Sequence, residues 1–172
     1  LIIIRSDAQS LPLDKDKFDL IYSYGVIHHT KNPLKVLSEC KRVLKNTGLM
    51  CLYVYSSHNQ NRWKSFGVLA ERLIMKSMYH YPKNIKLLIC FLITPVAWLL
   101  FTVPSKFLLL IGFYGLSKKM PFHWGKGPFS ILPDLKDRLL SPINHRYSKE
   151  SFESMLISLG MKSISSIEDE TG

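Results

Sequence analysis

The sequence predicts an α/β protein with an open parallel sheet, and the order of its first elements carries this prediction. Residues 1–5 and 18–24 are short runs rich in Ile, Leu and Tyr, a pattern typical of buried strands. A helix signal follows from Pro33 to a stop at Gly48, and residues 49–55 form a third apolar run. In sheets with such crossovers, ligands bind outside the carboxyl ends of the strands.

The helix signal begins with Asn32 as N-cap and Pro33 at the first helical position, where its missing N–H costs nothing. Gly48 in the stretch KNTG is expected to end it. Apolar side chains recur between these points at helical spacing: Leu34, Val36, Leu37, Cys40, Val43 and Leu44.

The segment 61–126 differs in composition from the rest and holds most of the formal net charge of +10. Against the single acidic residue Glu71 it carries ten basic residues: Arg62, Lys64, Arg72, Lys76, Lys83, Lys86, Lys106, Lys118, Lys119 and Lys126. Residues 61–81 predict a basic amphipathic helix, with Phe66, Leu69, Ala70, Leu73 and Met78 expected on its apolar side.

Two long apolar runs follow, at 87–103 and 107–116, and the first carries no charge. Its length is at the short limit of a membrane span, and Pro95 and Pro104 are expected to kink or end such a helix. Three alternatives stay open for this segment: a helical lid over the domain, an element that docks on a membrane surface, and a membrane span.

The C-terminal part predicts one helix and one strand that complete the sheet domain. Ser148 is the expected N-cap, Glu150 lies in the first turn where the helix dipole favours it, and Gly160 is the expected stop. Residues 161–167 are expected to return as a strand. The sequence thus divides into a sheet part at 1–60, a helical part at 61–126 and a completing part at 127–172.

His28 and His29 lie where the strand 18–24 ends, and two interpretations of them stay open. They either line a substrate or cofactor pocket or close the strand by bonding to nearby backbone. Adjacent histidines are expected to point apart in a strand or a helix, so we predict no metal site. Three cysteines without a CxxC pair predict neither zinc nor disulfides and favour a reducing compartment such as the cytoplasm.

The stretch SDAQSLPL followed by FDLIYSYGVIHHTKNPLKVLSECKRVLKNTGLMCLYVYS resembles the second half of the class I S-adenosylmethionine-dependent methyltransferase core. The resemblance is close over residues 3–56 and looser over 147–167. It implies a partial Rossmann-like sheet into which the basic, apolar helical segment is inserted. In that family a Gly-rich loop and a ribose-binding acidic residue precede this region, so the complete protein is expected to be longer, or this piece to be inactive.

The resemblance also implies which residues bind S-adenosylmethionine. Asp7 matches the acidic residue that accepts a hydrogen bond from the adenine amino group, and the backbone of Ala8 addresses the ring. Ser23, Tyr24 and Gly25 match the strand end beside the methionine part of the cofactor. For Asp7 the alternative is that it only caps the loop, and for Gly25 that it only serves a turn.

A shorter resemblance, in LSPINHRYSKESFESMLISLGM, is to the ending of related methyltransferases that carry a helical insertion. It implies that Asn144, His145 and Arg146 approach the mouth of the active site and contact substrate. The alternative is a surface turn ahead of a helix.

These observations predict a methyltransferase that transfers a methyl group to a small-molecule or lipid-linked, amphiphilic acceptor, with His28 or His29 as the candidate base. The chain is expected in the cytoplasm, with peripheral membrane contact through its basic apolar segment. A rival hypothesis is a membrane-docking or interaction module that has lost catalysis. Nucleic-acid binding is the weaker alternative, because the apolar runs are too long for a solvated phosphate-binding surface.

Overall fold

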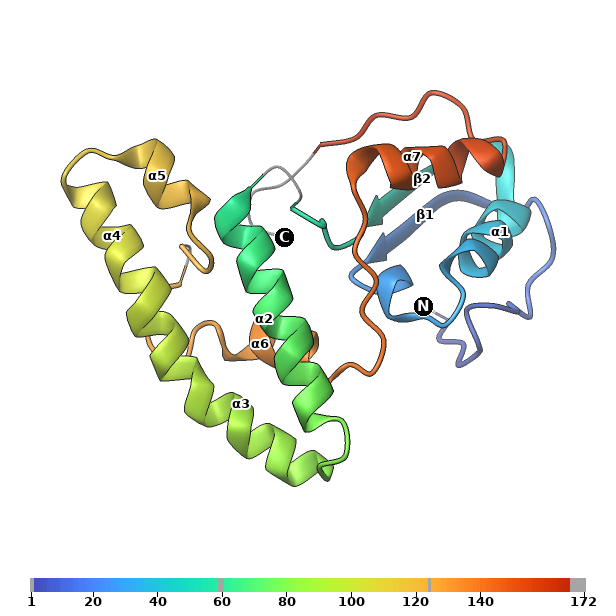
Figure 1. Ribbon diagram of the computed structural model, residues 1–172. Helices are drawn as coiled ribbons and strands as arrows, with labels where there is room; N and C mark the ends of the chain where they lie inside the picture. Colours follow the sequence, from blue (N-terminus) through green and yellow to red (C-terminus); the bar gives the residue numbers. More distant parts are fainter. Residues whose placement is uncertain (1, 59–60, 124, 168–172) are drawn as a thin grey trace. The chain divides into compact units, whose positions relative to one another are not determined.

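A computed structural model describes residues 2–58, 61–123 and 125–167 (Figure 1). The chain forms two compact units. The first unit contains residues 1–56 together with 143–168, and the second contains residues 57–142. The second unit therefore includes a helix near residue 135, which the division made from the sequence assigns to the C-terminal part.

Two parallel strands, β1 (Phe18–Tyr24) and β2 (Leu44–Tyr53), form the sheet of the first unit. Their register pairs Leu20 with Leu49 and Tyr24 with Tyr53, and it is irregular between Phe18 and Leu20. The connection between them is α1 (Pro33–Val43), so this is the strand–helix–strand unit that the sequence predicts. The α/β class and the partial Rossmann-like sheet are confirmed at this level.

The outer strands that the sequence predicts are wrong. Residues 2–5 have no regular structure, and Ile2 and Ile3 are 88% and 87% exposed; Leu1 lies outside the described residues. Residues 161–167 are also irregular, and Ile167 is 93% exposed. An apolar run becomes a strand only where a neighbouring strand takes its backbone hydrogen bonds, and within the described residues these two runs pair with none.

Helix α1 begins as predicted and ends earlier than predicted. The Asn32 side chain accepts a hydrogen bond from the Lys35 N–H (3.1 Å), and Pro33 is the first helical residue. The helix ends at Val43 because Leu44 is already extended, so Gly48 lies inside β2 and is not the helix stop. Strand β2 consequently starts five residues before the predicted position 49.

The core of the first unit lies on one face of the sheet. Its buried members are Ile27, Val36, Leu37, Cys40 and Leu156, and Ile21, Met50 and Leu52 of the strands pack against them. Helix α7 (Lys149–Ser158) contributes Leu156 and is capped as predicted by Ser148, which accepts from the Ser151 N–H. Gly160 follows with φ of +73°, a left-handed conformation that suits a helix stop.

A polar network fixes the loop before β1 to α1. The two carboxylate oxygens of Glu39 accept hydrogen bonds from Arg42, each at 2.9 Å, and Oε2 also accepts one from the Leu11 N–H. Arg42 donates further to the carbonyl oxygens of Leu11 and Leu13. The hydrogen bonds from Arg42, then that from Leu11, lower the pKa of Glu39 from its usual 4.5 to about 2.

The second unit is helical throughout its regular structure. Its elements are α2 (Arg62–Met78), α3 (Lys83–Ala97), the π-helical turn η2 (Trp98–Thr102), α4 (Val103–Leu110), α5 (Tyr114–Lys119) and α6 (Leu132–Leu140). Its core joins Met78 of α2, Cys90 and Ala97 of α3, and Ile131, Leu135 and Leu139 of the α6 region.

The helix predicted over 61–81 is confirmed as α2, and most of its predicted apolar side is exposed. Of the predicted residues, Phe66, Leu69 and Leu73 are 67%, 53% and 60% exposed, and Met78 is buried. Val68, which is not among them, is also buried, and Ile74 and Met75 pack on the core. Apolar residues occur on two sides of this helix, so periodicity alone does not identify the side that α3 and α6 cover.

The helix from Lys83 to Leu110 is continuous through α3, η2 and α4 and spans 28 residues. Among the described residues it is the one helix whose length and composition would suffice to cross a membrane. Pro95 lies inside it and Pro104 at the start of α4, so neither proline ends it.

The Glu39 network generates a stability prediction. A depressed carboxyl pKa stabilises the fold at pH values above the unfolded-state pKa, and the contribution is lost as the pH falls through the folded-state pKa. We therefore expect Glu39→Gln to unfold at lower urea concentration than the parent chain at pH 7. The difference should shrink between about pH 4.5 and about pH 2.

Asp14→Asn is the matched control, because it neutralises a carboxylate that is 83% exposed and lies on the loop before β1 that the network fixes to α1. Urea unfolding curves of both variants across this pH range provide the measurement. A Glu39→Gln variant as stable as the parent chain at pH 7 would show that the network does not hold the loop.

Candidate functional site

The carboxyl ends of β1 and β2 meet at one edge of the first unit, because the strands are parallel and Tyr24 pairs with Tyr53. The rings of these two tyrosines stack with centroids 4.2 Å apart. Gly25 then turns the chain with φ of +71°, and its N–H donates to the Tyr53 carbonyl (3.2 Å). Glycine suits this left-handed position because other residues are strained there.

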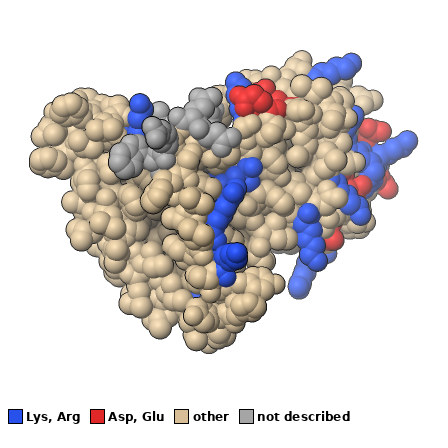
Figure 2. All heavy atoms as spheres, viewed as in Figure 1, with Lys and Arg blue, Asp and Glu red and all other residues tan. Residues whose placement is uncertain are grey.

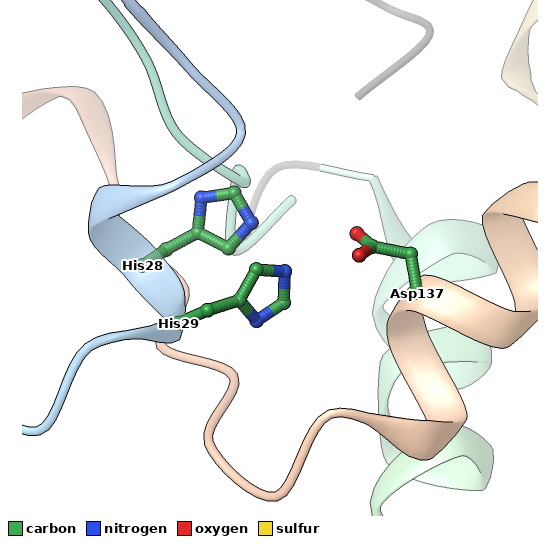
Figure 3. A group of neighbouring side chains, drawn as sticks. All are labelled: His28, His29 and Asp137. Carbon is green, nitrogen blue, oxygen red and sulfur yellow. The ribbon is translucent and has the colours of Figure 1, made fainter. Parts of the chain in front are cut away.

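His28 and His29 follow on the short helix η1 (Ile27–His29), which His29 N–H closes by donating to the Val26 carbonyl. Figure 3 shows both imidazoles projecting from this turn, and their centroids are 4.1 Å apart. The expectation that adjacent histidine rings point apart is therefore wrong. Directions at Cβ do not fix ring positions, and here both rings turn towards the same neighbour.

That neighbour is Tyr55, a buried residue two positions beyond the end of β2. Its ring centroid lies 4.1 Å from that of His28 and 5.9 Å from that of His29. The sequence motifs do not single out Tyr55. The alternation of Tyr53 and Tyr55 at the end of an apolar strand is the signal that could have identified it, because Tyr is amphipathic and suits a pocket edge.

Residues 143–147 run beside this edge and bring the C-terminal part of the chain to it. His145 N–H donates to the His28 carbonyl (2.9 Å), and Tyr147 N–H donates to the Tyr55 carbonyl (3.0 Å). Arg146 donates from Nη1 to the Ser56 carbonyl, and its guanidinium lies 5.2 Å from the centre of the Tyr55 ring. Asn144 lies in the same segment, so the three residues predicted to contact substrate reach the strand ends.

The two histidines differ in exposure and therefore in what they can do. The His28 side chain is completely buried, and the His29 side chain is half-buried. His29 Nδ1 lies 2.8 Å from the Ile143 carbonyl oxygen. A carbonyl only accepts, so Nδ1 must carry the hydrogen, and the neutral ring then has its basic lone pair on Nε2. His29 is thus the better candidate base, because the His28 side chain is completely buried.

Asp7 and Ala8 form part of a turn that follows the irregular residues 2–6. Asp7 Oδ1 accepts a hydrogen bond from the Gln9 N–H (2.9 Å), and the Asp7 carbonyl accepts from Ser10. Asp7 therefore does cap its loop. Because its side chain is exposed, the carboxylate can accept a further hydrogen bond. Ala8 packs against the core of the first unit, which contains Ile27, the first residue of η1.

The comparisons with known proteins concern the same region. A family model described as a methyltransferase domain matches residues 1–52. A provisionally named methyltransferase of Encephalitozoon cuniculi (strain GB-M1) is 37% identical over 65 residues, which are 36% of this chain and 31% of that protein. The polyketide synthase PksR of Bacillus subtilis (strain 168) is 33% identical over 66 residues, which are 38% of this chain and 3% of that protein. No solved structure matches.

The chain thus spans less than a third of the length of each of these two relatives. The match and the relatives confirm the resemblance of residues 1–52 to class I S-adenosylmethionine-dependent methyltransferases. The family match and the name of the Encephalitozoon cuniculi relative support methyl transfer in general. The helical segment beyond residue 60 lies outside the family match.

The histidine pair generates a prediction about metal. Metal-binding histidine pairs on helices usually sit three or four residues apart, whereas His28 and His29 are adjacent, and Nδ1 of His29 is engaged by the Ile143 carbonyl. We expect the purified chain to contain no stoichiometric zinc and chelators to leave its melting temperature unchanged. Elemental analysis and thermal melts with and without chelator are the measurements, and about one metal ion per chain would contradict the prediction.

Proposed function

We propose that this chain is the carboxyl-terminal part of a methyltransferase core that uses S-adenosylmethionine and transfers a methyl group to an amphiphilic or lipid-linked acceptor. The observation that carries the proposal is the family match over residues 1–52, which includes Asp7 and the strand end at Ser23, Tyr24 and Gly25. Ligands of parallel α/β sheets bind at such strand ends.

The residues present fit the cofactor at two places. The exposed Asp7 carboxylate is an acceptor-only group and suits the exocyclic amine of adenine. At Gly25 a Cβ would meet nothing within 4 Å, so there is open space beside the strand end where the family places the methionine part. The glycine itself is required by its positive φ and not by crowding.

The cofactor, when bound, would supply an electrophilic methyl group on a sulfonium for direct displacement. The chain's own residues then have to orient the acceptor and exclude water. If the acceptor atom is protonated, His29 would accept its proton at Nε2, since Nδ1 already holds a hydrogen that it donates to the Ile143 carbonyl. The segment containing Asn144, His145 and Arg146 would contact the acceptor, and the helical unit would serve as a lid.

A second candidate function is a membrane-docking module derived from a methyltransferase that has lost catalysis. The observation that favours it is the number of large apolar side chains exposed on the helical unit, among them Phe66, Leu92 and Leu99. The two candidates differ in cofactor binding. A chain that binds vesicles but not S-adenosylmethionine would be the docking module.

The proposal predicts that Asp7→Ala weakens S-adenosylmethionine binding by about 1.5–3 kcal/mol, the range for a hydrogen bond to a charged group. Isothermal titration calorimetry on the longest chain that includes these residues is the measurement. The predicted loss of binding free energy corresponds to roughly a 10- to 150-fold higher dissociation constant for S-adenosylmethionine.

Asp14→Ala serves as control, because it removes another exposed carboxylate of the same loop without touching the predicted cofactor contact. Its affinity for S-adenosylmethionine should equal that of the parent chain. Unchanged affinity of Asp7→Ala would refute the role of Asp7, and an absence of binding by the parent chain would refute the cofactor assignment for this chain.

A further inference from the structure

The buried side chains of the helix from Lys83 to Leu110 are small, whereas its large apolar side chains are either half-buried, among them Ile89, Ile93, Trp98 and Phe101 that pack against the core, or exposed. Its buried residues are Cys90, Thr94, Ala97, Thr102 and Ser105. A stripe of large apolar residues lies on its outer side, each 43–59% exposed: Ile85, Leu88, Leu92, Val96 and Leu99. These five residues, called here the outer stripe, recur at spacings of three and four, so they share one side of the helix.

Between Ile85 and Leu99 the outer side of this helix lacks the exposed polar residues that a water-facing helix shows. In water, burying large apolar side chains is the main source of stability, and polar residues face outwards. In lipid the surroundings are as apolar as Leu, so helices instead pack through small residues that allow close approach. The buried face here packs in that manner: Thr102 Oγ1 donates to the Phe122 carbonyl, and Ser105 Oγ bonds to Ser117.

The backbone at Gly125 also approaches the helix closely. A Cβ at Gly125 would lie 3.0 Å from Thr102 Oγ1, so the loop backbone contacts the helix directly. Small residues meet at Thr102 with Gly125 and at Ser105 with Ser117, and large apolar residues lie on the outside; together they indicate that the outer stripe has an apolar partner.

Charge identifies the kind of partner. From residue 72 to residue 133 the chain contains no Asp or Glu, and its charged side chains there are all basic. Lys83 and Lys106 are exposed and flank the outer stripe along the helix. Figure 2 shows the surface over α2, α3 and α4 as mainly uncharged, with isolated basic groups. An apolar stripe flanked by lysines complements an anionic bilayer surface.

Helix α6 decides between lying on the bilayer and crossing it. Leu135 and Leu139 of α6 pack with Cys90 and Ala97, in the middle of the Lys83–Leu110 helix. The same short helix carries Asp134, Lys136, Asp137 and Arg138, and Asp137 is exposed. A spanning orientation would place these charges at the depth of the hydrocarbon core, which is costly.

We propose that the helical unit docks on anionic phospholipid membranes with the Lys83–Leu110 helix in the plane of the interface and the outer stripe inserted. At about 1.5 Å per residue this helix is about 42 Å long, which gives an extended contact. The proposal deepens the proposed function by naming the phase in which the acceptor would be found, and in that respect it rests on the proposed function. It does not depend on catalysis, because docking needs neither cofactor nor acceptor.

Flotation of the chain with vesicles tests it, with phosphatidylcholine alone compared with phosphatidylcholine plus phosphatidylserine. We expect flotation with the anionic vesicles, weakened by high salt and released by alkaline carbonate. Leu99→Glu should weaken partitioning by about tenfold or more, since burial of a leucine side chain contributes that much. Leu92→Glu, two stripe positions away, is a second variant if the first one folds poorly.

The matched control is Leu49→Glu, the same substitution at a leucine that is 67% exposed on β2 of the first unit. It should float within about twofold of the parent chain. Lys83→Gln combined with Lys106→Gln should weaken binding to anionic vesicles by about 25-fold, or about fivefold for each lysine. Thermal melts confirm that each variant is folded.

Several results would overturn the proposal. These are no flotation with either vesicle, a Leu99→Glu variant that binds as tightly as the parent chain, and resistance to both salt and carbonate, which would mean a span. Self-association that the outer-stripe variants abolish, without vesicle binding, would instead assign the stripe to a second copy of the chain. Unchanged S-adenosylmethionine binding alongside any of these would leave the proposed cofactor site intact.

Discussion

The parallel pairing of β1 with β2 is the constraint on which the candidate site depends. Because Tyr24 pairs with Tyr53, both strands end at the same edge, and the residues that follow each strand are brought together. His28 and His29 come from the turn after β1, and Tyr55 comes from the segment after β2. A one-residue slip in this register would separate them and turn every strand side chain to the other face.

The third component of this sheet edge is the segment 143–147, which comes from a distant part of the chain and is held mainly by backbone hydrogen bonds. The segment 143–147 is about 90 residues away from Ser56 along the chain, yet Tyr147 and His145 donate to carbonyls at the two strand ends. Such bonds depend little on side-chain identity, so sequence reasoning alone could not locate them. The resemblance to methyltransferase endings could, because it relates this segment to the strand ends through a shared fold.

Elements with local causes were predictable from sequence. The Asn32 and Ser148 caps, Pro33 and Gly160 act within one helical turn, and the structure confirms all four. Elements whose existence requires a distant partner were not. Residues 2–5 and 161–167 have strand composition without a strand beside them, and α2 has apolar residues on two sides, of which α3 and α6 cover only one.

The Lys83–Leu110 helix differs from the first unit in the size of the side chains that it buries. The buried residues of the first core include large apolar side chains such as Ile27 and Leu37, whereas those of the Lys83–Leu110 helix are Thr, Ser, Ala and Cys, and most of its leucines are exposed. The proposed amphiphilic acceptor rests on this combination of a methyltransferase-like edge with exposed apolar side chains. The outward leucines are the part of this account that composition alone could not supply, because composition does not reveal which side is buried.

The central claim is that the carboxyl ends of β1 and β2 bind S-adenosylmethionine. Amide hydrogen exchange with and without this cofactor tests the claim most directly, because it reports binding at each strand end without knowledge of the acceptor. The account predicts slowed exchange at residues 7–10, 23–29 and 53–56, with no change in the Lys83–Leu110 helix. Exchange that is unaltered at all three strand-end segments, or protection confined to the helical unit, would contradict it.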